Sequence, residues 1–405
     1  EKNKENKNST IGSSLLPILE EYGVDIIFGI PGVHTVEIYR GLHETSIKHI
    51  TPRHEQGAGF MADGYSRVSG KPAVCLVITG PGLTNILTAL AQARADSIPM
   101  LIISSVNPYD NKRKLSGLLH ELPNQQKLLK KIAISSLTVK KTKDLIPAIK
   151  KSFLKMLEER PGPVHLEIPT NVLNYEYQKL KKNNLCIKKK KIKSSEKKIN
   201  EVSNYLTHAK YPVLLLGGGA RGCDEYILKI VDKLSPYVIT TINARGILGD
   251  HSMCIPASPT LKTVRKELKK ADIVLAVGTE FGETDYDMYK DGNFPKLKKL
   301  IRVDINKTQL TKNIQPYLTI RSDAIYFFKK LSEILLDKKH YKKSSLQTPQ
   351  MAKVIRKLCL SEIEPKFKVP LNLISIISSN FPDAILVGDS TQPTYAGNLY
   401  TKTSK

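Results

Sequence analysis

The sequence has 405 residues, of which 40% are hydrophobic and 25% charged, so it is neither a disordered nor a collagen-like chain, and its length predicts two to four domains. Lys and Arg outnumber Asp and Glu by 63 to 38, and the resulting net charge of +25 raises nucleic acid, membrane surfaces or acidic ligands as partners. No apolar run approaches the roughly 18 residues that cross a bilayer, and residues 1–9 contain no apolar signal-peptide core.

The first part of the chain alternates between helical and strand-like patterns. Helices are expected at residues 11–22, 34–44, 55–69, 83–95 and 145–159. Strands are expected at residues 24–28, 72–79, 99–104 and 163–168. Because short, continuously apolar strands that alternate with helices are typical of a parallel sheet covered on both faces, we expect an α/β domain over 1–180.

The alternation returns over 199–338, which predicts a second α/β domain. Its expected helices are 200–209 and 224–234. Its expected strands are 212–216, 237–241, 273–277, 300–303 and 318–320.

A third segment, 365–405, has a helical pattern at 371–379 and an apolar strand at 384–387 that leads into Gly388. Its length of about forty residues is below the roughly 50 of a self-standing domain. We therefore expect this segment to be the beginning of an incomplete third domain.

The positive charge is concentrated in two Lys-rich runs, 181–198 and 336–357. Segments that bind nucleic acid interleave aromatic with basic residues, whereas Tyr341 is the one aromatic residue in these runs. We interpret the runs as solvated linkers, with linker boundaries 181–198 and 339–364, and expect neither nucleic acid nor a membrane as a partner.

Cysteine and histidine usage predicts a reducing, cytoplasmic environment. The five cysteines form no CxxC pair, and the nine histidines show no HxH or HxxxH spacing. An odd, unpatterned set of cysteines argues against a disulfide framework and against a zinc site.

The turn GGGARG (217–222) satisfies G-x-G-x-x-G between a strand and a helix, as a pyrophosphate-binding turn does. The acidic residue expected about 20 positions later is missing, because the next strand leads into TTIN (240–243). The turn therefore packs the helix against the sheet or is the remnant of a nucleotide site. We prefer both interpretations to a working dinucleotide site.

Two other glycine-rich turns, FGIPGVH (28–34) and GPGLTN (80–85), follow strands of the first domain. Ligands of open α/β sheets bind outside the carboxyl ends of strands, and glycines let a ligand approach the backbone. A third segment, RHEQGAGFMADGY (53–65), opens a helix at the same edge and places Glu55 near its start. Taken alone, Glu55 is equally well a first-turn carboxylate stabilised by the helix dipole.

These motifs, with ADSIPM (95–100), resemble in order and spacing the pyrimidine-binding domain of thiamine diphosphate enzymes, the group of acetolactate synthase and benzoylformate decarboxylase. The resemblance continues through RPGPVHLEIP (160–169) and covers nearly the whole chain. It implies successive three-layer α/β domains with parallel sheets: a pyrimidine-binding domain, a Rossmann-like middle domain and an incomplete diphosphate-binding domain. The segments VHTVEIYRGL (33–42), LHELPNQ (119–125) and GDSTQPTYAGN (388–398) are most similar to the guanidino-oxopentanoate decarboxylases of the group.

The resemblance implies a non-oxidative decarboxylation of a 2-oxo acid, with 5-guanidino-2-oxopentanoate as one candidate. Glu55 matches the essential carboxylate of the family, which hydrogen-bonds N1′ of the aminopyrimidine so that the cofactor forms its C2 ylide. His54 is a candidate proton relay or only a helix cap, and His120 comes from a loop that reaches the active site in relatives. These three residues are the expected catalytic residues.

The matching motifs also imply binding residues. The expected cofactor-binding residues are Pro31, Gly32, Glu55, Gly82, Asn85, Gly388, Asp389, Ser390, Thr391 and Gln392. The expected substrate residues are Val33, His34, Glu121 and Gln125. A cationic guanidinium calls for a carboxylate in its pocket, and Glu121 is either that carboxylate or a surface charge.

One departure from the family concerns the metal. The family binds Mg²⁺ through a GDG motif followed by an Asn pair, and no such stretch occurs here, so we assign no metal ligand. We expect this chain alone to bind the cofactor weakly and not to turn over, and we do not expect FAD.

Several alternatives stay open. One alternative to a decarboxylase is an acetolactate synthase-type carboligase. Another is a non-catalytic subunit that pairs with an intact one. An NAD-dependent dehydrogenase is the least favoured alternative, because it leaves the Glu55 motif unexplained. The family resemblance further implies a homodimer or homotetramer with the active site at a subunit interface.

Overall fold

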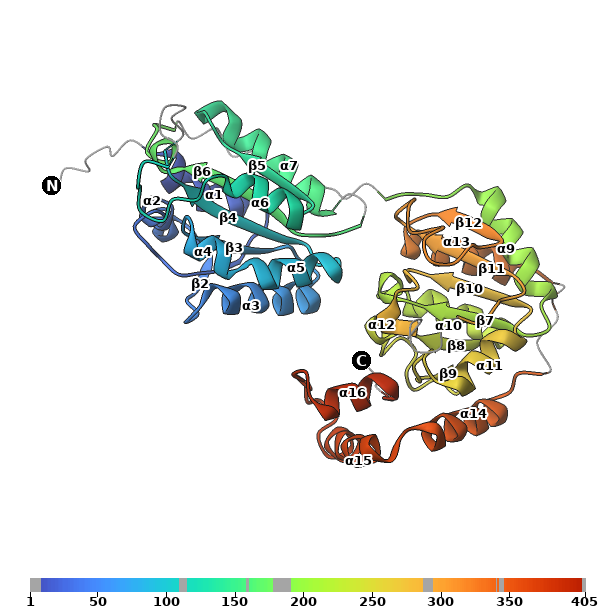
Figure 1. Cartoon of the computed structure of the whole chain (residues 1–405). Helices are drawn as coiled ribbons and strands as arrows, with labels where there is room; N and C mark the ends of the chain where they lie inside the picture. The colour runs from blue at the N-terminus through green and yellow to red at the C-terminus, as the bar shows by residue number, and fades with distance from the viewer. Residues whose placement is uncertain are drawn as a thin grey trace. The chain divides into compact units, whose positions relative to one another are not determined.

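The computed structural model describes residues 9–108, 115–157, 160–177, 191–286, 294–339, 341 and 346–402. It divides after Lys190 into two compact units (Figure 1). Residues 181–190 of the first expected linker lie outside the described residues, and the end of that expected linker already belongs to helix α9 (Glu196–His208).

The first unit is built on a sheet of six parallel strands in the order β2-β1-β3-β4-β6-β5. The strands are β1 (Ile26–Gly29), β2 (Lys48–Ile50), β3 (Ala73–Val77), β4 (Met100–Val106), β5 (Ser135–Thr138) and β6 (Val164–Pro169). The expected parallel sheet is confirmed. The two edge strands, β2 and β5, escaped the sequence analysis because they are short and polar.

Helices cover both faces of this sheet, as expected. They are α1 (Ile11–Glu21), α2 (Val36–Tyr39), α3 (Glu55–Ser69), α4 (Pro81–Asn85), α5 (Leu87–Ala95), α6 (Gln125–Ile132), α7 (Leu145–Leu157) and α8 (Thr170–Leu173). One hydrophobic core lies between the sheet and α1 and α7, and a second lies between the opposite face and α3, α5 and α6. The expected helix 34–44 is instead α2 followed by a 3-10 turn, and the expected helix 83–95 is divided into α4 and α5.

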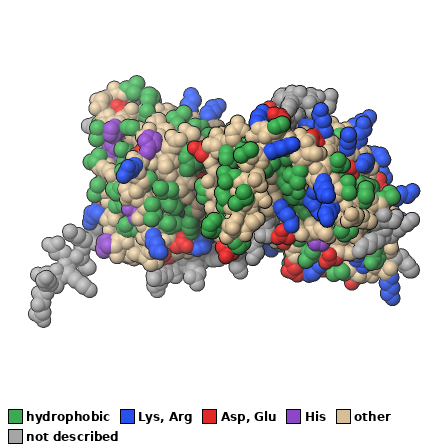
Figure 2. Space-filling view, turned by 90° about the horizontal axis from the view of Figure 1, so that it is seen from below, with side chains coloured by type: hydrophobic (Ala, Val, Ile, Leu, Met, Phe, Trp, Pro, Cys, Tyr) green, Lys and Arg blue, Asp and Glu red, His purple; other side chains and the backbone are tan. Residues whose placement is uncertain are grey.

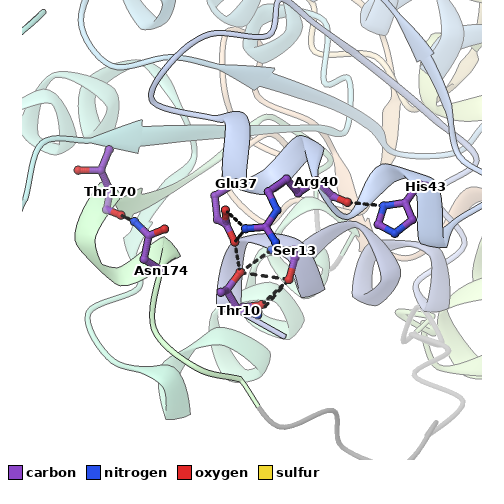
Figure 3. Close-up of polar contacts among 7 residues, drawn as sticks. All are labelled: Thr10, Ser13, Glu37, Arg40, His43, Thr170 and Asn174. Carbon is purple, nitrogen blue, oxygen red and sulfur yellow. Dashed lines mark hydrogen bonds and ion pairs between the residues drawn. The ribbon is translucent and has the colours of Figure 1, made fainter. Parts of the chain in front are cut away.

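Helices α1 and α2 pack closely because glycines lie where they meet. A Cβ on Gly12 would come within 2.6 Å of the Glu37 side chain, and one on Gly41 within 2.0 Å of the Ser13 carbonyl oxygen. The Glu37 carboxylate accepts a hydrogen bond from the Thr10 hydroxyl at 2.5 Å and forms an ion pair with Arg40 at 2.8 Å (Figure 3). These contacts fix α2, and with it the turn that precedes α2 at the sheet edge.

The second unit also has a sheet of six parallel strands, in the order β12-β11-β10-β7-β8-β9. The strands are β7 (Pro212–Leu216), β8 (Tyr237–Thr240), β9 (Cys254–Ile255), β10 (Ile273–Val277), β11 (Leu300–Asp304) and β12 (Leu318–Arg321). The helices of this domain are α9, α10 (Asp224–Leu234), α11 (Lys262–Lys270), α12 (Glu283–Tyr286) and α13 (Ala324–Asp337). The expected α/β middle domain is therefore confirmed.

The second expected linker, 339–364, is wrong over most of its length. Helix α14 (Pro349–Glu362) occupies it and packs against α11 and β9. Ala352, Ile355 and Cys359 are buried in the core of the second unit. Their spacing of three and four residues forms an apolar stripe, which the surrounding lysines obscured in the sequence.

The C-terminal segment contains α15 (Pro365–Asn380) and α16 (Gln392–Leu399) and belongs to the second unit. The strand expected at 384–387 does not form, since no strand of the described residues pairs with it, and Ile385 and Val387 are 82% and 92% exposed. Every described residue of α15 is at least partly exposed. Figure 2 shows hydrophobic side chains among Lys and Arg side chains on the face that it presents of each unit. In the part of the chain that the structure describes, no helix combines the length and apolarity that crossing a membrane requires.

Candidate functional site

The turn between β1 and α2 lies at the carboxyl end of the first unit's sheet. Thr35, which is buried, holds this turn: its hydroxyl donates to the Gly32 carbonyl at 3.1 Å, and the Gly32 N–H lies 3.2 Å from the same hydroxyl oxygen. Pro31 and Val33 are exposed at the tip. The backbone at Gly32 is therefore held rigidly while the residues on either side of it face outward.

A carboxylate and an amide meet at the same edge. The Asn85 side-chain amide donates to Glu55 Oε2 at 2.9 Å, although 30 residues separate them. Glu55 is the first residue of α3 and Asn85 the last of α4, so two helix ends fix the pair. The other carboxylate oxygen, Oε1, accepts no hydrogen bond from the described residues. One oxygen is thus held and the other is free for a ligand donor.

Two glycines form a cradle beside this carboxylate, and Ile78 is its floor. A Cβ on Gly82 would lie 2.6 Å from Ile78 Cγ1 and 3.4 Å from Glu55 Oε1. A Cβ on Gly32 would lie 2.7 Å from Ile78 Cγ2. The absence of both Cβ atoms lets the Ile78 side chain pack directly against the two turns, next to a free carboxylate oxygen. Ile78 was missed from the sequence, although it directly follows β3 and begins the ITGPG stretch.

His54 caps helix α3. Its backbone is extended, and its Nδ1 accepts a hydrogen bond from the Gln56 N–H at 3.1 Å. The capping alternative is therefore present in the structure. The relay role stays a prediction.

His34 and His120 form a pair over the Gly80 turn. Their rings meet edge to face with centroids 5.9 Å apart. Burial, and to a smaller extent the charge of His120, lower the pKa of His34, so this imidazole is neutral at pH 7. His120 has a left-handed backbone with φ of 56°, and its carbonyl oxygen would lie 2.2 Å from a Cβ on Gly80. The loop that carries His120 thus rests directly on the glycine turn.

The structure gives Glu121 and Gln125 roles other than the expected contact with substrate. Glu121 accepts hydrogen bonds from the N–H groups of Leu115, Gly117 and Leu118, so its carboxylate closes its own loop. Gln125 is 2% exposed, and its amide bonds to the Ser105 carbonyl of β4 and to the Glu167 carboxylate of β6. The contact of Glu121 and Gln125 with a substrate stays a prediction.

The remaining expected cofactor residues lie in the second unit. Gly388, Asp389, Ser390 and Thr391 form an exposed turn ahead of α16, and Gln392 is the exposed first residue of that helix. The Ser390 hydroxyl lies 2.7 Å from the Tyr395 hydroxyl, and the Ser390 N–H donates to the Asp389 carboxylate. Their contact with a diphosphate stays a prediction.

The GGGARG turn of the second unit is closely packed. The Gly219 N–H donates to the Gly278 carbonyl at 3.1 Å, and the Gly217 N–H donates to Val277 at 2.9 Å. A Cβ on Gly219 would lie 2.9 Å from the Gly278 Cα. Two glycine turns therefore fill the crevice between β7 and β10, where a dinucleotide would lie, and this packing favours the structural interpretation.

Within the described ranges, no three His, Cys, Asp or Glu side chains lie close enough together to hold a metal ion. The chemistry available at the first unit's edge is a fixed carboxylate, a pair of histidines of which His34 has a lowered pKa, and an apolar cradle. Such a set suits a flat, hydrogen-bonding heterocycle and proton transfer beside it.

Comparisons with known proteins agree with this arrangement. The chain matches the N-terminal TPP binding domain of thiamine pyrophosphate enzymes over residues 9–128 and their central domain over residues 199–331. It is 35% identical to the "Probable 2-ketoarginine decarboxylase AruI" of Pseudomonas aeruginosa, over 97% of this chain and 69% of that protein. It is 31% identical to the acetolactate synthase isozyme 1 large subunit of Escherichia coli, over 78% of this chain and 56% of that one.

A solved structure shares the fold. It belongs to a Mycobacterium smegmatis protein described as a candidate thiamin diphosphate-dependent enzyme, with a TM-score of 0.72 and 18% identity. The match covers 85% of this chain and 64% of that chain.

Proposed function

Because this chain belongs to the thiamine pyrophosphate enzyme family, we propose that it serves the non-oxidative decarboxylation of a 2-oxo acid with thiamine diphosphate as cofactor. The observation that carries the proposal is the carboxylate of Glu55, held by Asn85 and free at Oε1 beside the glycine cradle. A second observation is His34, whose pKa is lowered by burial and by His120, on another turn of the same sheet edge.

The cradle fits the aminopyrimidine end of the cofactor. Gly32 and Gly82 carry no Cβ, so Ile78 packs against both turns and provides an apolar surface on which a planar ring can lie. When bound, the cofactor supplies an electron sink for the electron pair of the broken C–C bond. Glu55 would accept a hydrogen bond from a ring nitrogen at Oε1 and hold its proton, while Asn85 keeps the carboxylate oriented.

The histidine pair would manage protons on the substrate side. A neutral His34 can accept a proton and become an imidazolium, or donate the N–H of its neutral ring to the substrate. His120 lies against it and can exchange a proton with bulk water, because it is exposed. We propose the pair as the route by which the product carbon regains a proton.

We propose 5-guanidino-2-oxopentanoate as the substrate, supported by the name of the Pseudomonas relative, a 2-ketoarginine decarboxylase. Acetolactate synthase-type carboligation is the second candidate, supported by the name of the Escherichia coli relative. Mg²⁺ would accompany the cofactor, because a hard cation with oxygen ligands neutralises a diphosphate. We propose a reducing, cytoplasmic compartment, supported by four free, buried cysteines: Cys75, Cys223, Cys254 and Cys359.

The test is product analysis on the product of the whole gene, supplied with thiamine diphosphate and Mg²⁺. Release of CO2 and an aldehyde from the guanidino acid supports the decarboxylase, and an acetohydroxy acid from pyruvate supports the carboligase. Glu55→Gln should lower turnover by about a hundredfold or more, the usual size of an acid–base contribution. Glu44→Gln, an acid on a nearby 3-10 turn, is the matched control and should keep full turnover. A fully active Glu55→Gln variant would refute the assignment.

A further inference from the structure

A buried polar network lies beneath the loop that carries His120. Glu167 on β6 is 6% exposed, and its Oε1 accepts a hydrogen bond from the Thr138 hydroxyl at 2.7 Å. Its Oε2 accepts one from the Gln125 side-chain amide at 3.2 Å. The same amide donates to the Ser105 carbonyl at 2.8 Å. Gln125 thus joins the ends of two neighbouring strands, β4 and β6.

The network is connected to the His120 loop through the chain itself. Gln125 is the first residue of α6 and directly follows that loop, residues 115–124. His120 has a left-handed backbone, which a residue with a Cβ keeps only when its surroundings hold it there. Asn107 adds a second attachment, because its amide donates to the Leu119 carbonyl at 3.2 Å.

Ser105 links this loop to the glycine turn on which the loop rests. Its carbonyl accepts from Gln125, and its hydroxyl oxygen accepts from the Thr79 N–H at 3.1 Å. Thr79 directly precedes Gly80, whose α-carbon faces the His120 carbonyl. Ser105 of β4 therefore holds two segments: it bonds Gln125 at the end of the loop 115–124, and it bonds Thr79 at the start of the Gly80 turn on which that loop rests.

We propose that Glu167 and Gln125 are positioning residues, whose buried carboxyl–amide pair holds the loop 115–124 so that His120 lies over Gly80 and against His34. The catalytic meaning of this clamp rests on the proposed function. The clamp itself acts without cofactor or substrate, so it can be tested on the chain as it stands. The burial that raises the pKa of Glu167 is consistent with a carboxyl that shares hydrogen bonds instead of facing water.

The first measurement uses the imidazole of His34 as a reporter. Its pKa is lowered by burial and by His120, so a loop that moves away should let the pKa rise toward the ordinary value. We expect Glu167→Ala and Gln125→Ala each to raise the pKa of His34 in an NMR titration of histidine-labelled protein. His120→Ala should act in the same direction. Gln92→Ala on α5, which removes an exposed amide bonded to Asp96, is the matched control and should leave His34 unchanged.

The second measurement is amide hydrogen exchange. In Glu167→Ala and Gln125→Ala, amides of the loop 115–124 should exchange about tenfold faster or more, while those of β3 and α1 keep their protection. Glu167→Gln should restore slow exchange, because an amide oxygen still accepts from Gln125. If Glu167→Ala does not fold, Gln125→Asn, which shortens the amide arm by one carbon, tests the same bond.

Three outcomes would overturn the clamp: an unchanged His34 titration with unchanged exchange of 115–124, a Glu167→Gln variant no better than Glu167→Ala, or faster exchange throughout the first unit. The last outcome would assign Glu167 to general stability. A protein without decarboxylase activity would refute the proposed function. Because neither measurement involves turnover, both would still decide whether Glu167 and Gln125 hold the loop 115–124.

Discussion

His165 lies fully buried in β6, with a ring nitrogen 2.8 Å from the hydroxyl of Ser104 and the other 2.8 Å from that of Ser136. Burial lowers the pKa of its imidazole to about 3. In the unfolded chain the His165 imidazole accepts a proton near pH 6.5, whereas in the folded chain it stays neutral at that pH. The contribution of His165 to stability is therefore complete above pH 6.5 and is lost as the pH falls from there toward 3, with a slope of about 1.4 kcal/mol per pH unit.

We expect His165→Gln, whose amide can also bond both serines, to flatten the fall of the unfolding free energy between pH 6 and pH 4. Urea unfolding of parent and variant at these values checks it. Glu167 works in the opposite sense, because burial raises its pKa, and the stability it contributes is lost as the pH rises through the folded value. Because the parent and the His165→Gln variant both contain Glu167, its contribution cancels when their unfolding free energies are compared. Parallel curves of unfolding free energy against pH would contradict the prediction.

The cradle predicts a specific steric coupling between Gly82 and Ile78. An alanine at position 82 would place its Cβ 2.6 Å from Ile78 Cγ1. We expect Gly82→Ala to lower the unfolding free energy by about 1–3 kcal/mol, the usual cost of overpacking. Because Ile78→Ala removes the clashing atoms, the double variant should lose less than the sum of the two single changes.

The matched control is Gly64→Ala on α3, where an added Cβ meets no atom within 4 Å. Alanine is favoured over glycine inside a helix by about 0.5–1 kcal/mol, so this change should be neutral or stabilising. Chemical denaturation of the four proteins provides the double-mutant cycle. A strictly additive cycle would show that Ile78 is not the floor of the cradle.

Gly32, Gly82 and Asn85 were predictable, because each sits in a short motif that follows an expected strand, whereas Glu55 was assigned through the family resemblance and Ile78 was missed. Gly32, Gly82, Asn85 and Glu55 are brought together by the parallel sheet, which places all strand ends at one edge. The role of Gln125 was not predictable. It depends on side-chain contacts with strands 20 and 42 residues away, and no local pattern marks such contacts.

At the scale of elements, helix α3 has two apolar faces. Ala58 and Ala62 are buried against the sheet, whereas Met61 and Val68 on the opposite face are 45% and 82% exposed. The face of α3 that points away from the sheet carries Gly57, Met61, Gly64 and Val68, at spacings of four, three and four residues. This spacing is typical of a helix–helix seam, and the glycines would let a second helix approach closely.

We expect α3 to contribute to an interface between copies of this chain. Met61→Glu and Val68→Glu should each weaken self-association at least about tenfold, because a charge would be buried at the seam. Sedimentation velocity over a concentration series measures it. Leu128→Glu, at an exposed apolar position of α6, is the matched control and should leave association unchanged. Unaltered association of both α3 variants would exclude the seam.

The long helices and central strands were predictable because an apolar period extends over several turns or residues. The division of the expected helix 83–95 into α4 and α5 was not, since it occurs at Ile86, whose ψ of −8° departs from that of an α-helix although no proline or glycine marks the position. The strand expected at 384–387 fails for a different reason. A β pattern records only a preference, and a strand also needs a neighbour to accept its hydrogen bonds.

At the scale of the whole molecule, the chain consists of two units with separate cores, and α14 contributes to the core of the second unit. A solvated linker at 339–364 would leave the second sheet uncovered beside α11. The structure instead buries Ile355, which is 4% exposed, and leaves Leu360 on the same helix 41% exposed. The helix is therefore part of the cooperative second unit.

This assignment predicts a large difference between two similar truncations on one helix. Ile355→Ala leaves a cavity in the second core and should lower the unfolding free energy of that unit by about 2–5 kcal/mol. Leu360→Ala, the matched control, should change it by less than about 0.5 kcal/mol, as surface substitutions do. Calorimetry, with the transition of the first unit identified by Leu16→Ala, checks both values. Equal, small effects of the two substitutions would show that 339–364 is a solvated linker after all. A shift of the first unit's transition by Ile355→Ala would show that the two units unfold as one.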